Sequence, residues 1–483
     1  MIHFRPVARV LGMLLLIMGV SMLLVVPVSW YHDSGDAGAM VFSALLCFLV
    51  GIPLWMLKKE DSDRNLKKRE GYLIVALGWF AMSSFGALPY LISGVIPGVP
   101  DALFETVSGI TTTGASILTD IESVPKGILF WRSFTQWIGG MGIIVLTVAI
   151  LPLLGIGGIE LFVAEAPGPT SDKLHPRISG TAKRLWFIYL ALTLSLFAFL
   201  WIAGMSGYDA INHAFTTMAT GGFSTRNNSI AYYSPIIQYI LIVYMFLAGV
   251  NYTVLYFAFK RKMTRVWKSD EFRYYLFMVL FFMFIVSLRV YQVEDLSFEK
   301  AFRDSSFQIV SLITTTGFVT ADYTSWSSGL TMFFFILLFV GACAGSTAGG
   351  IKVIRHLVFF KNSYLEFKRI LHPRAVVPLK INELTVPGRV ITHVIIFLLL
   401  YLLSFLLGSI VLSVMGYDFM TSIGAVATSL GNVGPGIGKV GPVDNFAWMT
   451  DGAKLVLSFL MLLGRLELFT ILVLFTPFFW KSN

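Results

Sequence analysis

The sequence predicts an all-α polytopic membrane protein with ten transmembrane helices. Of its 483 residues, 56% are hydrophobic and only 13% are charged, whereas about a quarter of the residues in a soluble domain are charged. The mean hydropathy is +0.77. A further observation is a short semi-polar segment that recurs four times between the apolar stretches. Together these features exclude an ordinary soluble fold.

Ten apolar stretches are long enough to cross a bilayer, which requires about 20 apolar residues. The first follows Arg5 and Arg9 and reaches Trp30 without a small-residue cleavage site, so we interpret it as a retained span and not as a signal peptide. The two cysteines, Cys47 and Cys343, lie in apolar or Gly-rich segments and do not predict a disulfide framework. The expected spans cover residues 8–30, 38–57, 71–93, 128–154, 185–205, 236–259, 274–291, 329–360, 390–415 and 453–480.

Lysine and arginine are unevenly distributed among the connecting segments. With a cytoplasmic N-terminus, 27 of the 36 basic residues fall on the same side of the membrane. Cytoplasmic loops are enriched in Lys and Arg, so the distribution predicts a multi-pass chain with both termini in the cytoplasm. Topology therefore accounts for the net charge of +9, and we expect no nucleic-acid partner. The cytoplasmic segments would be the N-terminus, residues 58–70, 155–184, 260–273 and 352–389, and the C-terminus.

The four semi-polar segments, each too short and too polar to cross a bilayer, fall on the opposite side. The first and third share Asp, Phe, Val, Ser, Ile and the whole of TTTG at the same offsets, whereas the fourth keeps little beyond its spacing, Thr428 and Gly434. The chain thus repeats a span, a short re-entrant segment and a second span four times. Aligned on the last glycine, the segments read DALFETVSGITTTG (101–114), DAINHAFTTMATGG (209–222), DSSFQIVSLITTTG (304–317) and TSIGAVATSLGNVG (421–434). We expect a two-helix extension over residues 1–69 and repeats over residues 70–180, 181–270, 271–380 and 381–483.

Each segment begins with a helix-competent stretch of about ten residues, roughly 15 Å long, or half of a membrane. Asp101 and Asp209 suit helix N-termini, both as caps and as charges that the helix dipole favours. The helix must then end at the threonines and glycine, and non-helical backbone at that depth must be buried in protein or line a water-filled cavity. Four helix C-termini around one axis would present carbonyl oxygens to a cation, and glycine supplies backbone angles that other residues resist. A polar kink in a packed bundle is the alternative, but four glycines in register favour the cation site.

These motifs resemble the Trk/Ktr/HKT superfamily of potassium transporters, and the resemblance covers essentially the whole chain. It implies two extra N-terminal spans and then four M1–pore loop–M2 repeats around one central pore, with one filter glycine per repeat. Some sodium-preferring plant relatives have serine at the first of these positions, so Gly114 favours potassium. The fourth loop departs from the pattern, with Asn432 and Val433 where the first has threonines. The filter residues implied are Thr111, Thr112, Thr113, Gly114, Ala219, Thr220, Gly221, Gly222, Thr314, Thr315, Thr316, Gly317, Gly431, Asn432, Val433 and Gly434.

The eighth apolar stretch is interrupted by GACAGSTAGGIK (341–352). Small residues can form a close helix-packing face, but Gly349 and Gly350 in tandem predict unwound backbone, which within a membrane must line a cavity. The superfamily has an intramembrane gating loop at this place. The resemblance assigns the gate to Gly341, Gly345, Ser346, Thr347, Gly349 and Gly350.

The tenth stretch carries Arg465 and Glu467 within an apolar run. Ionisable residues at this depth usually face the protein interior and mark an ion path. Residues two apart on a helix point to different faces, so we do not expect these two to pair. The resemblance implies that an arginine here lies near the pore beneath the filter, which makes Arg465 a candidate electrostatic barrier and part of the gate. A structural arginine satisfied by carbonyl groups of a neighbouring loop is the alternative.

The resemblance implies potassium-selective uptake across the bacterial inner membrane, channel-like and driven by the membrane potential. A proton- or sodium-coupled symporter on the same fold is the alternative, although no acidic proton relay is evident along the pore. The sequence contains no nucleophile triad, no paired catalytic carboxylates and no metal-ligand spacing of histidines, so we expect neither an enzyme nor a cofactor, with K⁺ as the transported ion. The resemblance also implies a homodimer in contact with membrane lipid and a cytosolic nucleotide-binding regulatory subunit, TrkA.

Overall fold

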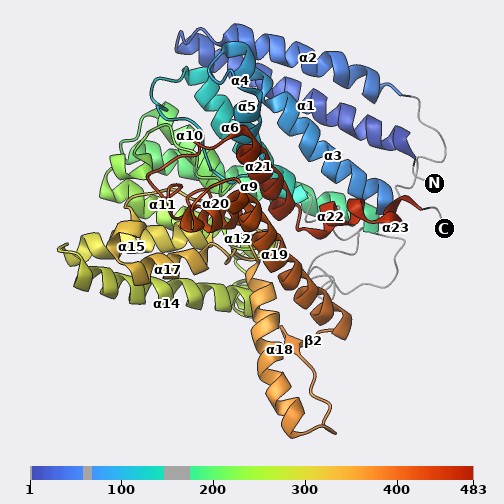
Figure 1. Cartoon of the computed structure of the whole chain (residues 1–483), viewed down its shortest axis with the longest axis vertical. Coiled ribbons are helices and arrows are strands. Elements are labelled where there is room, and N and C mark those ends of the chain that lie inside the picture. Colours follow the sequence, from blue (N-terminus) through green and yellow to red (C-terminus); the bar gives the residue numbers. More distant parts are fainter. Residues whose placement is uncertain (1–2, 58–67, 146–173, 482–483) are drawn as a thin grey trace.

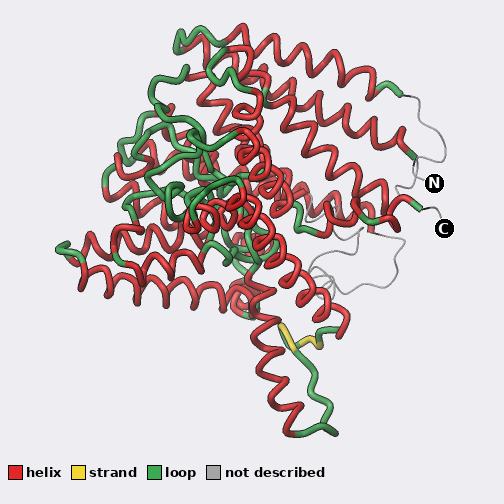
Figure 2. The backbone as a smooth tube through the Cα atoms, viewed as in Figure 1, coloured by secondary structure: helices red, strands yellow, loops and turns green. Residues whose placement is uncertain are grey.

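The computed structural model describes residues 3–57, 68–145 and 174–481, which are mostly helical (Figure 1). Many of the loops gather at the end of the helices remote from both termini (Figure 2). The longest helices are α1 (Phe4–Tyr31), α2 (Ala37–Trp55), α3 (Lys68–Gly86), α6 (Lys126–Val145), α9 (Leu174–Ile202), α14 (Asp270–Val293), α18 (Val353–Leu371) and α19 (Gly388–Val414). Shorter helices are α4 (Leu88–Ser93), α5 (Val99–Ile110), α10 (Gly207–Met218), η4 (Ser229–Tyr232), α11 (Pro235–Ala248), α12 (Tyr252–Phe259), α13 (Met263–Trp267), α15 (Phe298–Ile313), α16 (Tyr323–Trp326), α17 (Ser328–Leu337), α20 (Phe419–Gly431), α21 (Asp451–Arg465), α22 (Phe469–Leu472), η5 (Val473–Phe475) and α23 (Pro477–Trp480).

A large core of buried apolar side chains runs through the helices from α1 to α22. A smaller cluster, which includes Val358, Ile381 and Val390, packs α18 against α19 and a two-stranded antiparallel sheet. This sheet pairs β1 (Lys380–Ile381) with β2 (Leu384–Thr385). Together α18 and the sheet project from the rest of the molecule (Figure 1). The projecting unit therefore has its own packing and is not an extension of the main core.

The two N-terminal helices are fastened to the rest of the chain through Asp36. Its carboxylate accepts a hydrogen bond from the backbone N–H of Ile128, at 2.6 Å, in the first turn of α6. It also accepts hydrogen bonds from the hydroxyls of Ser29 and Ser34. A carboxylate is favoured at a helix N-terminus because unpaired N–H groups and the positive end of the dipole lie there. Asp36 thus docks the α1–α2 hairpin onto the first turn of α6.

Six helices in the described part of the chain are long and apolar enough to cross a membrane, or eight if two bent helix pairs each count as one span. The ten-span count remains a prediction, and its fourth stretch, 128–154, continues outside the described residues. Three other predicted stretches are not single straight helices. They cover residues 236–259, 329–360 and 453–480.

Two of these stretches bend sharply. In the stretch 236–259, α11 ends at Ala248 and α12 begins at Tyr252, with an angle of 108° between the two helices. The side chain of Asn251 accepts the backbone N–H of Thr253 and caps α12. The helix over 453–480 bends by 109° after Arg465, because Glu467 and Leu468 take φ angles of 57° and 52°. Left-handed residues end an α-helix, which accounts for this second bend. Continuous helices are wrong at both places.

The eighth stretch, 329–360, is interrupted rather than bent. Helix α17 ends at Leu337, and no helical residue follows until Val353. Gly345 and Gly350 have φ angles of 69° and 63°, which glycine adopts without a steric cost. The small residues of this stretch therefore form a loop and not a helix-packing face.

The four re-entrant segments form the short helices α5, α10, α15 and α20. The caps differ from those expected. Ser206 caps α10 by accepting the backbone N–H of Asp209, and α5 begins after Gly98 with no side-chain cap. Asp101 and Asp209 instead lie in the first turns, where the helix dipole still favours a carboxylate. The expected charge effect holds, but the expected capping role is wrong, because the N-cap position of each helix lies three residues before its aspartate.

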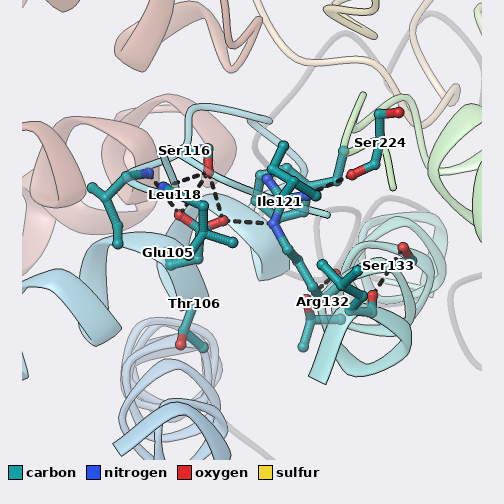
Figure 3. A network of polar contacts seen from close by, with 12 residues as sticks. Glu105, Thr106, Ser116, Leu118, Ile121, Arg132, Ser133 and Ser224 are labelled. Carbon is teal, nitrogen blue, oxygen red and sulfur yellow. Dashed lines mark hydrogen bonds and ion pairs between the residues drawn. The ribbon is translucent and has the colours of Figure 1, made fainter. Parts of the chain in front are cut away.

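A buried ion pair positions the first of these helices (Figure 3). The Arg132 guanidinium on α6 donates from Nε to Oε1 of Glu105 on α5 over 2.6 Å, and both side chains are almost inaccessible to solvent. Glu105 also accepts the backbone N–H of Ile117 at 2.9 Å, and Arg132 Nη1 donates to the carbonyl of Ser224 at 3.0 Å. The pair thus connects α5, α6 and the segments that follow the first and second re-entrant helices.

Breaking this pair from one side should destabilise the protein strongly. Glu105→Gln leaves a buried guanidinium without its counter-charge, which costs about 3–5 kcal/mol. We therefore expect a large fall in the apparent melting temperature of the purified protein in detergent. Arg132→Met should do the same, and the double variant should lose less than the sum of the two single variants.

Glu366→Gln is the matched control, because Glu366 pairs with Arg369 over 2.8 Å on the exposed face of α18. Exposed pairs contribute little to stability, so its melting temperature should stay near that of wild type. An equal response of the Glu105 and Glu366 variants would contradict a structural role for the buried pair.

Candidate functional site

The four short helices end in the same backbone conformation. We call residues 111–114, 219–222, 314–317 and 431–434 the four polar turns. In each turn the second residue has a φ between 52° and 54°, and the last residue is a glycine with a φ between 76° and 102°. The N–H of the third residue bonds to the carbonyl five positions back, as in Thr113 to Ser108 at 2.8 Å and Val433 to Thr428 at 3.0 Å. This is a Schellman-type helix end, and the fourth turn adopts it although its side chains differ.

The last glycines bring the four turns into a closed ring. Each glycine Cα faces the carbonyl of the third residue of the next turn. The neighbours are Gly114 and the Gly221 carbonyl, Gly222 and the Thr316 carbonyl, Gly317 and the Val433 carbonyl, and Gly434 and the Thr113 carbonyl. A Cβ added at Gly434 would lie only 2.8 Å from the Thr113 oxygen, and the other three would lie closer still to their carbonyls. The ring therefore leaves no room for a side chain at any of its four glycines.

This arrangement can stabilise a cation. Four helix C-termini carry partial negative charge, and a ring of backbone carbonyls can replace the hydration shell of an ion. Two threonine hydroxyls in each of the first and third turns are bonded within the turn and the helix before it. Thr111 Oγ1 donates to the Val107 carbonyl at 2.6 Å and lies 2.7 Å from Thr113 Oγ1. Thr314 repeats this pattern. In these turns the threonines thus hold the backbone that presents the carbonyls.

Asn432 connects the fourth turn to two neighbours. Its Nδ2 donates to Thr113 Oγ1 at 3.0 Å and to the Met461 carbonyl at 2.9 Å on α21. An asparagine also adopts the left-handed conformation, here with φ 53°, more readily than most residues. The departure of the fourth turn from the threonine pattern therefore serves both its backbone and its contacts.

Sequence reasoning missed Gln136, which holds the second turn from α6. Its Nε2 donates to the Gly221 carbonyl at 2.7 Å, and its Oε1 accepts the Phe223 N–H at 3.2 Å. The side chain thus bonds to the backbone on both sides of Gly222. Its place in the sequence could have identified it, because a polar residue within an apolar stretch is costly in a membrane and usually marks a functional position.

A second missed feature lies nine positions before each turn glycine. Three of the four helices carry a polar side chain there that bonds to the segment after its own turn. Glu105 binds Ser116 and Ile117, His213 binds Ser224 at 2.9 Å, and Gln308 donates to the Ala321 carbonyl at 3.0 Å. The fourth helix has Ala425 at this position. The aligned repeats contain a polar residue at this position in three of four cases, but only the contacts show which segments these side chains bind.

The non-helical segment 338–352 lies against the ring from its helix side. Val340 and Ile351 form a bridge that closes the loop, and the Gly341 N–H donates to the Ile351 carbonyl at 2.8 Å. The Gly349 N–H donates to Thr315 Oγ1 at 2.6 Å, and a Cβ at Gly349 would lie 2.6 Å from the Gly431 carbonyl.

Thr347 extends this contact to a third helix end. Its hydroxyl donates to the Met218 carbonyl at 3.0 Å, at the end of α10. Two of the loop residues singled out by the sequence, Thr347 and Gly349, therefore lie directly against the ends of three of the four short helices.

Arg465 and the loop are in contact. Arg465 Nη1 donates to the Thr347 carbonyl at 2.8 Å, and the side chain is buried. Within the described part of the chain, its Nε and Nη2 have no hydrogen-bond partner. Glu467 turns elsewhere and pairs with Arg355 of α18 over 2.5 Å, and the Arg355 guanidinium lies 3.8 Å from the centre of the Phe397 ring.

Comparisons with known proteins identify relatives along the whole chain. The family TrkH, described as cation transport protein, matches residues 38–482. The Trk system potassium uptake protein TrkH of Salmonella typhimurium is 41% identical over 99% of this chain and 100% of its own length, and that of Vibrio parahaemolyticus is 42% identical with the same coverage. A crystal structure of the potassium transporter TrkH from Vibrio parahaemolyticus matches with a TM-score of 0.91 and 40% identity, over 99% of this chain and 100% of that chain. This chain therefore belongs to the TrkH family of cation transport proteins.

Proposed function

We propose that this protein carries potassium into the cell across the bacterial inner membrane, through a pore that the four polar turns line. The observation that carries the proposal is the closed ring of four glycines, each against a carbonyl of the next turn. The family membership and the names of the relatives as potassium uptake proteins support the choice of ion. The proposed architecture has ten spans, four M1–pore loop–M2 repeats and two N-terminal helices outside them.

The turns act as the selectivity filter in this proposal. An ion loses water at the filter, so the carbonyl oxygens must be held at the correct separation. Backbone contacts between neighbouring turns, together with Gln136 and Asn432, support such a fixed ring. Glycine at the first position, Gly114, favours potassium over sodium.

The loop around residues 341–350 and Arg465 act as the gate. The loop lies against three of the four helix ends, so it would obstruct an ion that leaves the ring towards the cytoplasm. Arg465 offers five donors and does not deprotonate. It holds the loop at Thr347, and its remaining donors are unpaired within the described residues. A buried cation at this place would repel K⁺ while the gate is closed.

Ions would follow the membrane potential, without a coupled ion. A homodimer would carry one pore in each protomer, with both termini of each chain in the cytoplasm. A cytosolic nucleotide-binding subunit of the TrkA type would regulate the gate. The chain would need no cofactor, and K⁺ is its transported ion.

The purified protein in liposomes should conduct K⁺ and Rb⁺ without a regulatory subunit, because the proposed pore lies within one chain. The reversal potential should follow the K⁺ gradient and should not shift when pH or the Na⁺ gradient is changed. Radioactive rubidium uptake and voltage-clamped bilayers measure these quantities. A reversal potential that follows the proton or sodium gradient would establish the symporter instead, and absence of potassium flux from folded protein would refute the proposal.

Gly114→Ser should weaken the preference for potassium over sodium. The new side chain meets the Gly221 carbonyl and must adopt a φ of +87°, so the ring must open locally. A difference of about 1.4 kcal/mol between two ions changes their ratio about tenfold, and we expect a loss of about this size. The permeability ratio from bi-ionic reversal potentials is the measurement.

Gly94→Ser is the matched control, because Gly94 has a φ of +73° but no atom near its missing Cβ. This substitution also places a serine in the left-handed conformation, but away from the ring. The ion preference of the Gly94→Ser variant should therefore equal that of wild type. If Gly114→Ser conducts normally with unchanged selectivity, Gly114 does not line the filter.

Arg465→Ala and a short deletion within 341–350 should each raise the basal potassium flux severalfold while the ion preference stays the same. The first removes both the contact with Thr347 and the positive charge, and the second removes the obstruction. The two effects should not add, because both changes open the same gate. Liposome flux of the folded variants is the readout.

Arg289→Ala is the control for loss of an arginine charge, because Arg289 is exposed on α14. Its flux should match wild type. If the Arg465 and loop variants are folded and also conduct no faster than wild type, the loop is only a packing break and Arg465 only a structural cation.

A further inference from the structure

A pocket of about 450 Å³ lies between α9 and α12, away from the ring and the loop. Three basic residues, Lys183, Arg184 and Lys260, line it together with Tyr256. The Arg184 guanidinium lies 5.8 Å from the centre of the Tyr256 ring, and the Lys260 ammonium lies 6.0 Å from the same centre. The pocket therefore concentrates positive charge around one aromatic side chain.

No carboxylate within the described residues neutralises these three cations, and none lines the pocket. Three other basic residues assigned to the same side are paired within the described part of the chain. Lys361 and Arg273 both contact Asp270, and Arg369 contacts Glu366. Among the described residues, the pocket is thus a place where an anion would meet positive charge that no carboxylate offsets.

The remaining wall of the pocket is apolar and continues along a candidate membrane span. Phe187 and Ala191 on α9 and Phe259 on α12 line it, and the side chains of Phe187 and Phe259 are 66% and 58% exposed. The candidate span runs from Ala182 to Ile202. Leu194, about two turns beyond Phe187, is also exposed. An apolar track therefore leads from the basic end of the pocket along the outer face of α9.

The distribution of Lys and Arg along the sequence assigns this end of α9 and α12 to the cytoplasmic side. Nearby, α13 exposes Met263 and Trp267 beside Arg265. Tryptophan is enriched where a protein meets the membrane–water interface. The pocket thus lies where the headgroups of the inner leaflet would be.

We propose that this pocket binds an anionic phospholipid of the inner leaflet. The phosphate lies among Lys183, Arg184 and Lys260, and an acyl chain follows Phe187 and Ala191 along α9. Basic pockets between helices on the cytoplasmic side recognise such headgroups by charge. The apolar track favours a lipid over a cytosolic protein, because a protein partner cannot follow α9 into the hydrocarbon.

The test measures lipid retention on the purified full-length protein by native mass spectrometry and thermal stabilisation in nanodiscs. Wild type should retain phosphatidylglycerol in preference to phosphatidylcholine, and phosphatidylglycerol should raise its melting temperature. Lys183→Gln, Arg184→Gln and Lys260→Gln should each weaken this binding about fivefold, and the triple variant should lose the preference. These side chains are exposed, so the variants should fold.

The matched control is the triple variant Arg261→Gln, Lys262→Gln and Lys268→Gln, which removes the same charge from exposed residues outside the pocket. It should keep the preference for phosphatidylglycerol. Ala191→Phe fills the track without a change of charge and should also weaken lipid retention. Soluble glycerol phosphate, which has the headgroup charge but no acyl chain, should not stabilise wild type.

Three results would overturn the proposal. Equal losses in the pocket and control triple variants would show a general surface effect and not a site. Full stabilisation by glycerol phosphate would identify a soluble phosphate as the ligand. Unchanged lipid retention in the pocket variant, with weaker binding of a purified cytosolic regulatory subunit, would identify the surface as a protein interface. None of these readouts depends on ion flux, so they remain separate from the test of transport.

Discussion

The contact of each turn glycine with a backbone carbonyl of the next turn is the constraint on which the rest of the structure depends. It is a contact between backbones, so it tolerates no side chain and little displacement. To reach it, four helices must end at the same level, each with a residue in the same left-handed conformation. Within a membrane, the exposed carbonyls at such ends are costly unless they line a cavity or bind a partner. The ring is therefore both tightly packed and suited to an ion.

Much of the surrounding polar structure holds this ring in place. From α6, Gln136 reaches the ring and Arg132 holds the segment after the second turn, and Asn432 joins the fourth turn to the first. The ion pair of Arg132 with Glu105 would be expensive to bury alone. Its value is positional, because it joins the first short helix to the segments that follow two of the turns. The same reasoning applies to His213 and Gln308, which fasten their own helices in the same way.

The interruptions of the eighth and tenth stretches are also explained by contacts at and around the ring. A continuous eighth helix could not place Thr347 and Gly349 against three helix ends, and a continuous tenth helix would place Glu467 elsewhere. The bend after Arg465 lets residues that are close in the sequence contact different partners. Arg465 reaches the loop, whereas Glu467 reaches Arg355 on the projecting helix α18. This gives a continuous physical connection from the loop beside the ring to the part of the chain that projects furthest.

The sequence by itself determined the membrane class, the family resemblance, the four aligned helix ends and the Gly-rich break. These properties depend on composition, on apolar length and on residues that act locally, such as a glycine in a left-handed conformation. It did not determine the caps of α5 and α10, the bends after Ala248 and Arg465, or the roles of Gln136 and Arg355. Only the tertiary structure decided these, because each depends on which carbonyl, amide or charge from a distant segment lies within hydrogen-bond distance. Closure of the ring itself belongs to this second group, since no single turn contains the carbonyl that its own glycine must face.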